Sequence, residues 1–171
     1  MSSTPITYRG KEFTADDGIM AVWLHFVIKE MDKLPHISAW LKETRDEWNV
    51  QSTVDLGYVD PGLDQVISTE EQRDLIVSLY DAAMRKLRLY GDYIEADELN
   101  AMNTGGEGSF FTERLPTKFF ITHGDFFIRL LKNELGPDET DARLDMFRRV
   151  EEEIEQGKLI RVGKGGIRPS R

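Results

Sequence analysis

The amino-acid sequence predicts a mainly α-helical protein with a single compact domain, residues 1–171, made of about six helices. A chain of 171 residues has the size of one ordinary domain and buries enough surface to fold without disulfide or metal staples. Its 40 % hydrophobic and 31 % charged residues are typical of a globular protein. Apolar residues recur at steps of three and four in several segments, which is the spacing of one helix face.

The first two helices are expected within the first fifty residues. Thr14 and Asp17 have the spacing of a capping box, and apolar residues then follow at helical intervals. Residues 1–13, which come before this signal, are expected to form a loose terminus. Pro35 suits the first turn of a second helix, which carries Trp48 and other apolar residues on one side.

The third helix has the strongest signals in the chain. Ser68 and Glu71 form an S-x-x-E capping box, and a regular apolar stripe then continues to Gly91. A shorter helix is expected after Asp92, which is a suitable cap. Residues 103–109, NTGGEGS, are expected to form a Gly-rich loop.

Two more helices are expected near the C-terminus. Thr122 and Asp125 predict the cap of the first, and the second is expected from about Asp138 to Gln156. Residues 163–171 are rich in Gly and basic side chains and are expected to be a loose tail. Short strands or a hairpin are also compatible with residues 54–59, 110–121 and 158–162.

The charge distribution gives the main indication of function. The net charge is −9, which disfavours sequence-independent binding to nucleic acid. Between Glu43 and Asp81 only Arg45 and Arg73 oppose ten carboxylates. This segment is suited to steering a basic protein partner, although a solvated acidic face that keeps the protein soluble is an equally simple explanation.

The sequence therefore predicts a non-enzymatic cytoplasmic interaction protein, such as an inhibitor or immunity protein that covers a cationic partner. Trp48, if it is exposed beside the acidic loop, is a candidate anchor. The candidate partner-binding residues are Asp46, Glu47, Trp48, Asp55, Asp60 and Asp64.

No cofactor or metal is expected. The chain has no cysteine, so disulfides and thiolate zinc sites are excluded. Asp60 and Asp64 stand at positions one and five of a calcium-loop spacing, but Gly62 and Gln65 do not suit positions three and six. No signal peptide or membrane-spanning segment is recognised, and a cytoplasmic location is the resulting expectation.

Two alternatives remain open. One is a small helical enzyme or ligand-binding protein whose aromatic pocket is lined by the segment from Phe110 to Phe127 and uses His123, Asp125 and Arg129. His123 and Asp125 are the weak catalytic candidates, because a carboxylate near an imidazole can orient it. The other alternative is a self-assembling structural subunit, since the oligomeric state is not specified by the sequence.

Overall fold

The computed structural model describes residues 2–54, 57–106, 111–162 and 166–170, and it confirms a mainly helical, single compact domain. The helices of this described part are α1 (Asp17–Met31), α2 (Ala39–Thr53), α3 (Leu63–Val66), α4 (Glu70–Arg88), α5 (Ala96–Ala101), α6 (Thr117–Leu131) and α7 (Ala142–Glu155). The strands form three antiparallel pairs: β1 (Ser3–Tyr8) with β2 (Lys11–Asp16), β3 (Tyr93–Ile94) with β4 (Leu115–Pro116), and β5 (Leu159–Val162) with β6 (Gly166–Pro169).

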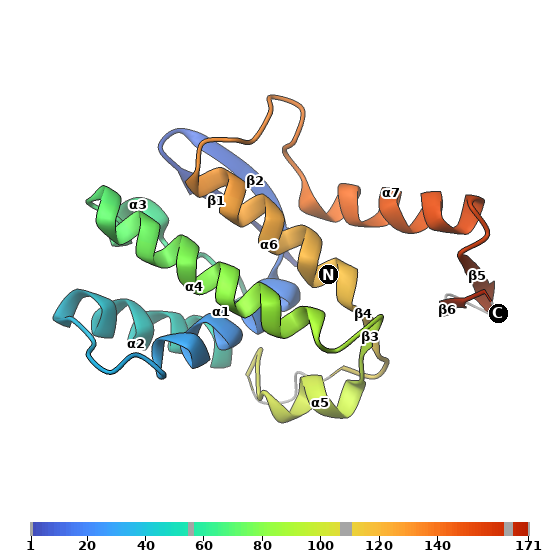
Figure 1. Ribbon diagram of the computed structural model, residues 1–171, viewed down its shortest axis with the longest axis horizontal. Coiled ribbons are helices and arrows are strands. Elements are labelled where there is room, and N and C mark those ends of the chain that lie inside the picture. The colour runs from blue at the N-terminus through green and yellow to red at the C-terminus, as the bar shows by residue number, and fades with distance from the viewer. Residues whose placement is uncertain (1, 55–56, 107–110, 163–165, 171) are drawn as a thin grey trace.

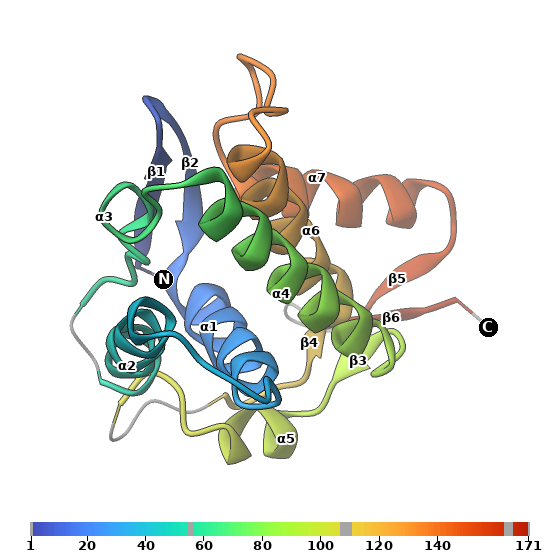
Figure 2. The same ribbon diagram turned by 60° about the vertical axis from the view of Figure 1, so that its left-hand side comes forward.

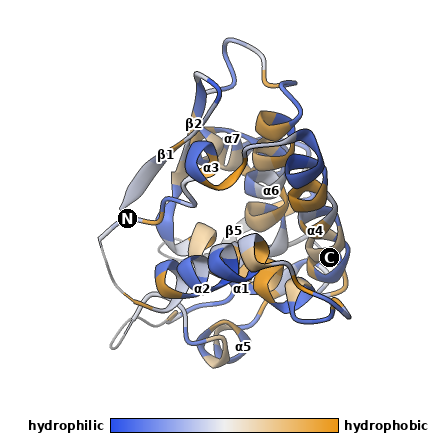
Figure 3. Cartoon of the chain, turned by 90° about the vertical axis from the view of Figure 1, so that its left-hand side faces the viewer, coloured by the Kyte–Doolittle hydropathy of each residue, from blue (hydrophilic) through white to orange (hydrophobic). Residues whose placement is uncertain are grey.

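Three helices form the centre of the domain. Helix α1 packs against α2, α4 and α6, and α6 packs in turn against α4 and α7 (Figures 1 and 2). Helix α2 therefore covers one side of α1, while α7 extends along the far side of α6. Figure 3 shows hydrophobic residues along α6 and on one side of α4, as expected for helices that bury an apolar face.

An aromatic stack holds the central helices together. The ring of Tyr80 on α4 lies 3.9 Å from the ring of Phe127 on α6 and 5.2 Å from that of Trp23 on α1, measured between centroids, and is nearly parallel to both. The indole of Trp48 on α2 meets the same tyrosine edge-on. Four helices therefore share one buried ring, and such pairs contribute beyond the area that they bury.

Helices α1 and α6 approach closely at Gly124. A Cβ atom at this position would lie 2.2 Å from Cζ2 of Trp23 and 2.8 Å from Cε of Met84. The indole of Trp23 occupies this space and donates a hydrogen bond of 2.8 Å to the carbonyl oxygen of Phe120. The absence of a side chain at Gly124 is thus what allows this packing.

The N-terminal segment differs from the loose terminus that the sequence predicts for residues 1–13. Strands β1 and β2 form a hairpin in which Ile6, Tyr8 and Phe13 are buried. Arg9 and Gly10 both have positive φ at the two-residue turn, which matches the twist of a hairpin. The paired strands keep their apolar side chains against the domain, so this segment is part of the core.

Several helix ends also differ from those predicted. The capping box of α4 is one residue further on: Thr69 accepts the backbone N–H of Gln72, and the Gln72 side chain accepts that of Thr69. Thr122 and Asp125 lie inside α6, which begins five residues earlier, at Thr117, and they do not cap it. Local spacing alone does not distinguish neighbouring caps, so tertiary packing selects the boundary.

The C-terminal segment forms a hairpin of β5 and β6, where a loose tail is expected from residue 163 onward. Tyr93 donates its hydroxyl proton to the carbonyl oxygen of Ile167, which connects this hairpin to β3. The expectation for residues 163–165 and 171, and for the Gly-rich loop at 107–109, lies outside the described residues. A strand is confirmed within 158–162.

Candidate functional site

Helix α2 has two faces of different character. Its buried positions recur every three or four residues, and the helix packs against α1. Its exposed positions 43, 47 and 50, continued by Val54 at the C-cap, form a separate stripe. The buried residues are Leu41, Thr44, Trp48 and Ser52. The exposed stripe is made of Glu43, Glu47, Val50 and Val54. Together with Tyr58, which follows in the loop, we call this stripe the α2 face.

The acidic half of the α2 face retains its charge. Glu43 and Glu47 have no ion-pair partner among the residues that the structure describes. Asp46, beside them, is different, because Lys42 donates to its carboxylate at 2.9 Å and Arg45 at 3.1 Å. These bonds lower the pKa of Asp46, with the Lys42 contact contributing most. Two of the three acids of this turn are therefore free to attract a cation.

The other half of the α2 face is apolar. Val50, Val54 and Tyr58 have 48 %, 45 % and 50 % of their surface exposed. Single exposed apolar residues are common, but here Val50 lies one helical turn from Glu47, and Val54 and Tyr58 follow it along the chain. The sequence analysis did not identify Val50, Val54 or Tyr58. The spacing of 43, 47, 50 and 54 would have indicated their shared face, once the start of α2 was known.

Trp48 does not serve as an exposed anchor, which corrects the expectation from the sequence. Its side chain is fully buried, and its indole N–H donates a 2.9 Å hydrogen bond to the carbonyl oxygen of Pro61. The large ring is needed to fill the space between α2 and the aromatic stack. A partner cannot reach it in this conformation.

The predicted acids of the loop after α2 have local structural roles. Asp60 accepts the N–H of Gly62 at 2.9 Å, and Asp64 accepts the N–H of Arg9 at 2.9 Å, which connects α3 to the N-terminal hairpin. Asp55 lies outside the described residues. Within the described segments, no three His, Asp or Glu side chains are grouped as a metal site.

His123 is completely buried in α6. Its Nε2 atom accepts the backbone N–H of Asp16 at 3.1 Å, and its Nδ1 atom lies 2.9 Å from the carbonyl oxygen of Phe119. Both contacts are satisfied together only by the neutral tautomer with the proton on Nδ1. Burial also lowers the pKa of His123. The imidazole is thus neutral and fully bonded, which are the properties of a structural histidine.

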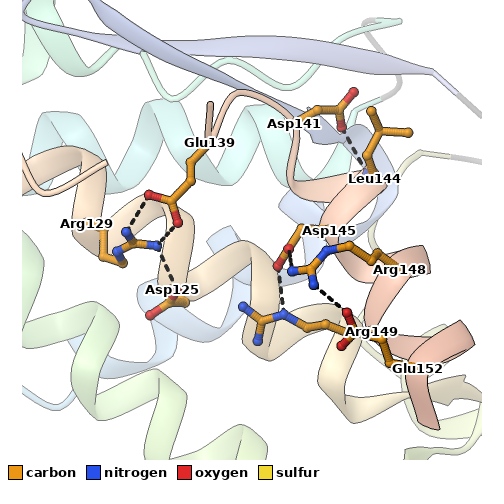
Figure 4. A network of polar contacts seen from close by, with 9 residues as sticks. All are labelled: Asp125, Arg129, Glu139, Asp141, Leu144, Asp145, Arg148, Arg149 and Glu152. Atoms are coloured by element: carbon orange, nitrogen blue, oxygen red, sulfur yellow. Dashed lines mark hydrogen bonds and ion pairs between the residues drawn. The ribbon is translucent and has the colours of Figure 1, made fainter. Parts of the chain in front are cut away.

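Asp125 follows His123 by two residues in α6, which places the two side chains on different sides of the helix, and it belongs to an ion-pair network (Figure 4). Arg129 lies 3.6 Å from Asp125 and makes two hydrogen bonds to Glu139, at 2.5 and 2.6 Å. The guanidinium of Arg129, together with the N–H of Gly136, lowers the pKa of Glu139 to about 2. This network fastens the loop before α7 onto α6.

A similar set of ion pairs lies along α7. Asp145 is paired with both Arg148 and Arg149, and Arg148 also contacts Glu152 at 2.5 Å (Figure 4). Arginines and carboxylates in this part of the fold therefore neutralise one another. On the α2 face, by contrast, neither Glu43 nor Glu47 forms an ion pair with another described residue.

The predicted aromatic pocket is only partly formed by its expected residues. A cavity of 500 Å³ is lined by Phe111 and Phe119 together with Phe147 of α7. Its lining does not include His123, Asp125 or Arg129. The cavity with the aromatic lining is therefore not the place where these three polar residues lie, and the pocket expected from the sequence, which combines both, is not formed at this cavity.

The chain matches no model of a known protein family, no curated protein and no solved structure. Among the helices described, none has both the length and the apolar character needed to cross a membrane. A functional assignment therefore depends on the geometry of the chain itself.

Proposed function

We propose that the protein is a non-enzymatic binding protein that holds a basic protein partner through the α2 face. The observation that supports this proposal is that Glu43 and Glu47, which form no ion pair with a described residue, share one face of α2 with half-exposed Val50. Val54 and Tyr58, also half-exposed, follow at the end of that helix. Free charge beside apolar surface is the usual composition of a specific interface, in which each part has a different role.

The carboxylates would act before contact. Glu43 and Glu47 lie within a segment that carries ten acids and two arginines, and such a field attracts a cationic surface and increases its rate of association. Because neither acid forms an ion pair with a described residue, binding a lysine or arginine does not first require breaking such a pair.

The apolar residues would act after contact. Val50 lies on α2, Val54 at its C-cap and Tyr58 in the loop that follows, and covering them with a partner removes apolar surface from water. Tyrosine is also enriched among residues that contribute most to interfaces. The partner is accordingly a basic protein with an apolar patch, and the protein acts as its inhibitor or immunity protein by covering the cationic surface.

The experiment immobilises the full chain on a resin and exposes it to a lysate of its source cells. The retained proteins are quantified by mass spectrometry at low and high salt. Three variants are compared with the natural chain. The first is Glu43→Gln with Glu47→Gln, and the second is Val50→Ser with Val54→Ser. The control is Glu71→Gln with Asp81→Asn, which removes two charges from α4. Calorimetric titration with the purified partner then gives the dissociation constants.

We expect a basic protein that the natural chain and the α4 control retain and that high salt releases. Each α2 variant should weaken its binding about tenfold, the glutamines through lost steering and the serines through lost burial. The proposal fails if the retained proteins are not basic, if salt does not affect them, or if the α2 variants bind as well as the control. Light scattering that shows self-association through this face would favour a structural subunit instead.

A further inference from the structure

A groove of 1040 Å³ lies between the C-terminal parts of α1 and α4 and helix α5. Residues of all three elements line it, and Figure 2 shows α5 below the end of α1. Six of the lining residues carry the argument: Phe26, Lys29, Lys86, Tyr90, Tyr93 and Met102. The size is that of a site for a small molecule, and the lining combines aromatic rings with charged groups, as such sites do.

Aromatic rings form the walls of the groove. Phe26 and Tyr90 meet edge to face, with centroids 6.0 Å apart and an angle of 87° between their planes. Both are only half-buried, so part of each ring faces the groove. Tyr93 adds a third ring, which is covered by Arg114 at 4.3 Å from its centroid. Rings set at right angles offer a flat ligand one face and one edge, the two arrangements that aromatic groups prefer.

Three of the charged residues that line the groove, Glu30, Lys33 and Glu95, are already paired. Lys33 lies 2.5 Å from Glu30, and Arg114, outside the lining, lies 3.9 Å from Glu95. These carboxylates are therefore largely neutralised by neighbouring cations.

Two lysines remain without a carboxylate within 4 Å among the described residues. They are Lys29 of α1 and Lys86 of α4, and the single unpaired acid of the lining is Glu98. The free charge of the groove is thus positive, in a chain whose net charge is −9. Both lysines also lie near helix C-termini, where a cation stabilises the helix, so their role must be tested separately from stability.

We propose that this groove binds a small aromatic anion, with its ring against Phe26 and Tyr90 and its acidic group at Lys29 and Lys86. The proposal is independent of the α2 face, because none of its residues lines the groove. Lysine ammonium groups satisfy a carboxylate, sulfonate or phosphate through charge-assisted hydrogen bonds. The aromatic walls select for a flat ring over an aliphatic chain.

The test titrates the full-length chain with 8-anilinonaphthalene-1-sulfonate, an aromatic anion whose fluorescence increases in an apolar site. Lys29→Gln with Lys86→Gln removes both ammonium groups. The matched control, Lys42→Gln with Lys132→Gln, removes two charges elsewhere on the surface. Circular dichroism establishes that all three proteins are folded. Displacement by 2-naphthoate, 2-naphthamide and 2-naphthylmethylamine then compares an anion, a neutral molecule and a cation with the same ring.

We expect saturable binding of one probe per chain, a shift of the NMR signal of the Met102 methyl group, and displacement in the order anion, neutral, cation. The variant at Lys29 and Lys86 should bind the probe about tenfold more weakly than the control. Equal binding by both variants, displacement by the amine as readily as by the naphthoate, or no saturable binding would each overturn the proposal. So would a shift at Met146, which lines the separate cavity beside Phe147.

Discussion

His123 accepts a hydrogen bond from the backbone N–H of Asp16, a residue 107 positions earlier in the chain. The same Asp16 caps α1, because its carboxylate accepts the N–H of Ile19 at 3.0 Å. One buried imidazole thus connects the interior of α6 to the first turn of α1, at the junction where the N-terminal hairpin ends. Disturbing this contact should affect both helices together.

Stability should decrease in weak acid because of His123. Burial lowers its pKa in the folded protein, so below the unfolded pKa of about 6.5 the unfolded chain binds a proton that the native state excludes. The stability that comes from keeping His123 neutral is complete above this pH. It decreases by up to about 1.4 kcal/mol per pH unit as the pH falls toward the folded pKa.

His123→Gln should reduce this pH dependence, measured as unfolding free energies in urea at a series of pH values. His36→Gln, a substitution at an exposed histidine, is the control. His25→Gln should have a smaller effect of the same sign, since burial and Lys29 also lower the pKa of His25. An unchanged pH dependence in His123→Gln would contradict the neutral, bonded imidazole.

Gly124→Ala should destabilise the protein by at least about 1–3 kcal/mol, because the new methyl group would overlap the indole of Trp23. Thermal unfolding followed by circular dichroism measures this loss. Gly18→Ala is the matched control, since a Cβ there meets only Asp16 Oδ1, at 3.3 Å. If the two substitutions have equal effects, close packing of α1 on α6 is not what requires Gly124.

Tyr80 should tolerate loss of its hydroxyl but not of its ring. The buried hydroxyl has no hydrogen-bond partner among the described residues, and burial raises its pKa. Tyr80→Phe should therefore be neutral or stabilise by up to about 1 kcal/mol. Tyr80→Ala should cost about 3–5 kcal/mol, because it empties the space between Trp23 and Phe127. Denaturant unfolding measures the stability of both variants. A large loss of stability in Tyr80→Phe would show that the hydroxyl has a hydrogen-bond partner.

The start of α4 can be tested with two adjacent substitutions. Thr69→Ala should cost about 1 kcal/mol, because it removes the side chain that accepts the N–H of Gln72. Ser68→Ala should cost much less, since only the backbone N–H of Ser68 takes part in this cap. Equilibrium unfolding in urea measures both losses of stability. A larger loss in Ser68→Ala than in Thr69→Ala would contradict the Thr69 cap and favour the Ser68–Glu71 capping box that the sequence predicts.

Glu139 should titrate with a pKa near 2 in the folded protein, measured from the carboxyl ¹³C shift. Its contribution to stability is present above the unfolded pKa and is lost as the pH falls toward 2. Arg129→Gln should return the pKa toward its usual range, because it removes both hydrogen bonds to the carboxylate. Lys132→Gln removes a charge at the C-cap of α6 but neither of these bonds, and it should leave the pKa low.

Much of the helical fold could be predicted because its signals are local. The apolar stripe of α4 specifies a helix whatever surrounds it, and the apolar periodicity of α1 does the same. The N-terminal hairpin was not predicted, because an Arg9–Gly10 turn is a weaker signal than Asn-Gly and Thr14 suggested a helix cap. The pairing of β1 with β2 is stabilised by packing on α6 and α7, which no local pattern contains.

The candidate site was predicted in part. The sequence located the acidic segment and named Asp46 and Glu47, but it treated Trp48 as an exposed anchor. Whether a tryptophan on an amphipathic helix faces the core or a partner depends on the helix phase relative to the rest of the fold. Gln51, three residues after buried Trp48, is half-exposed, and Val54, six residues after it at the C-cap of α2, is exposed.

The amino-acid sequence by itself determined the helical class, the excess of negative charge and the absence of cysteine chemistry, because these are properties of composition and short-range spacing. Tertiary structure alone decided which charges remain free. Arg129 neutralises Glu139 from another element, whereas no cation of the described segments pairs with Glu43. Pairing depends on which side chains the fold brings within a few ångströms, and Coulomb interactions between exposed charges weaken quickly beyond that distance.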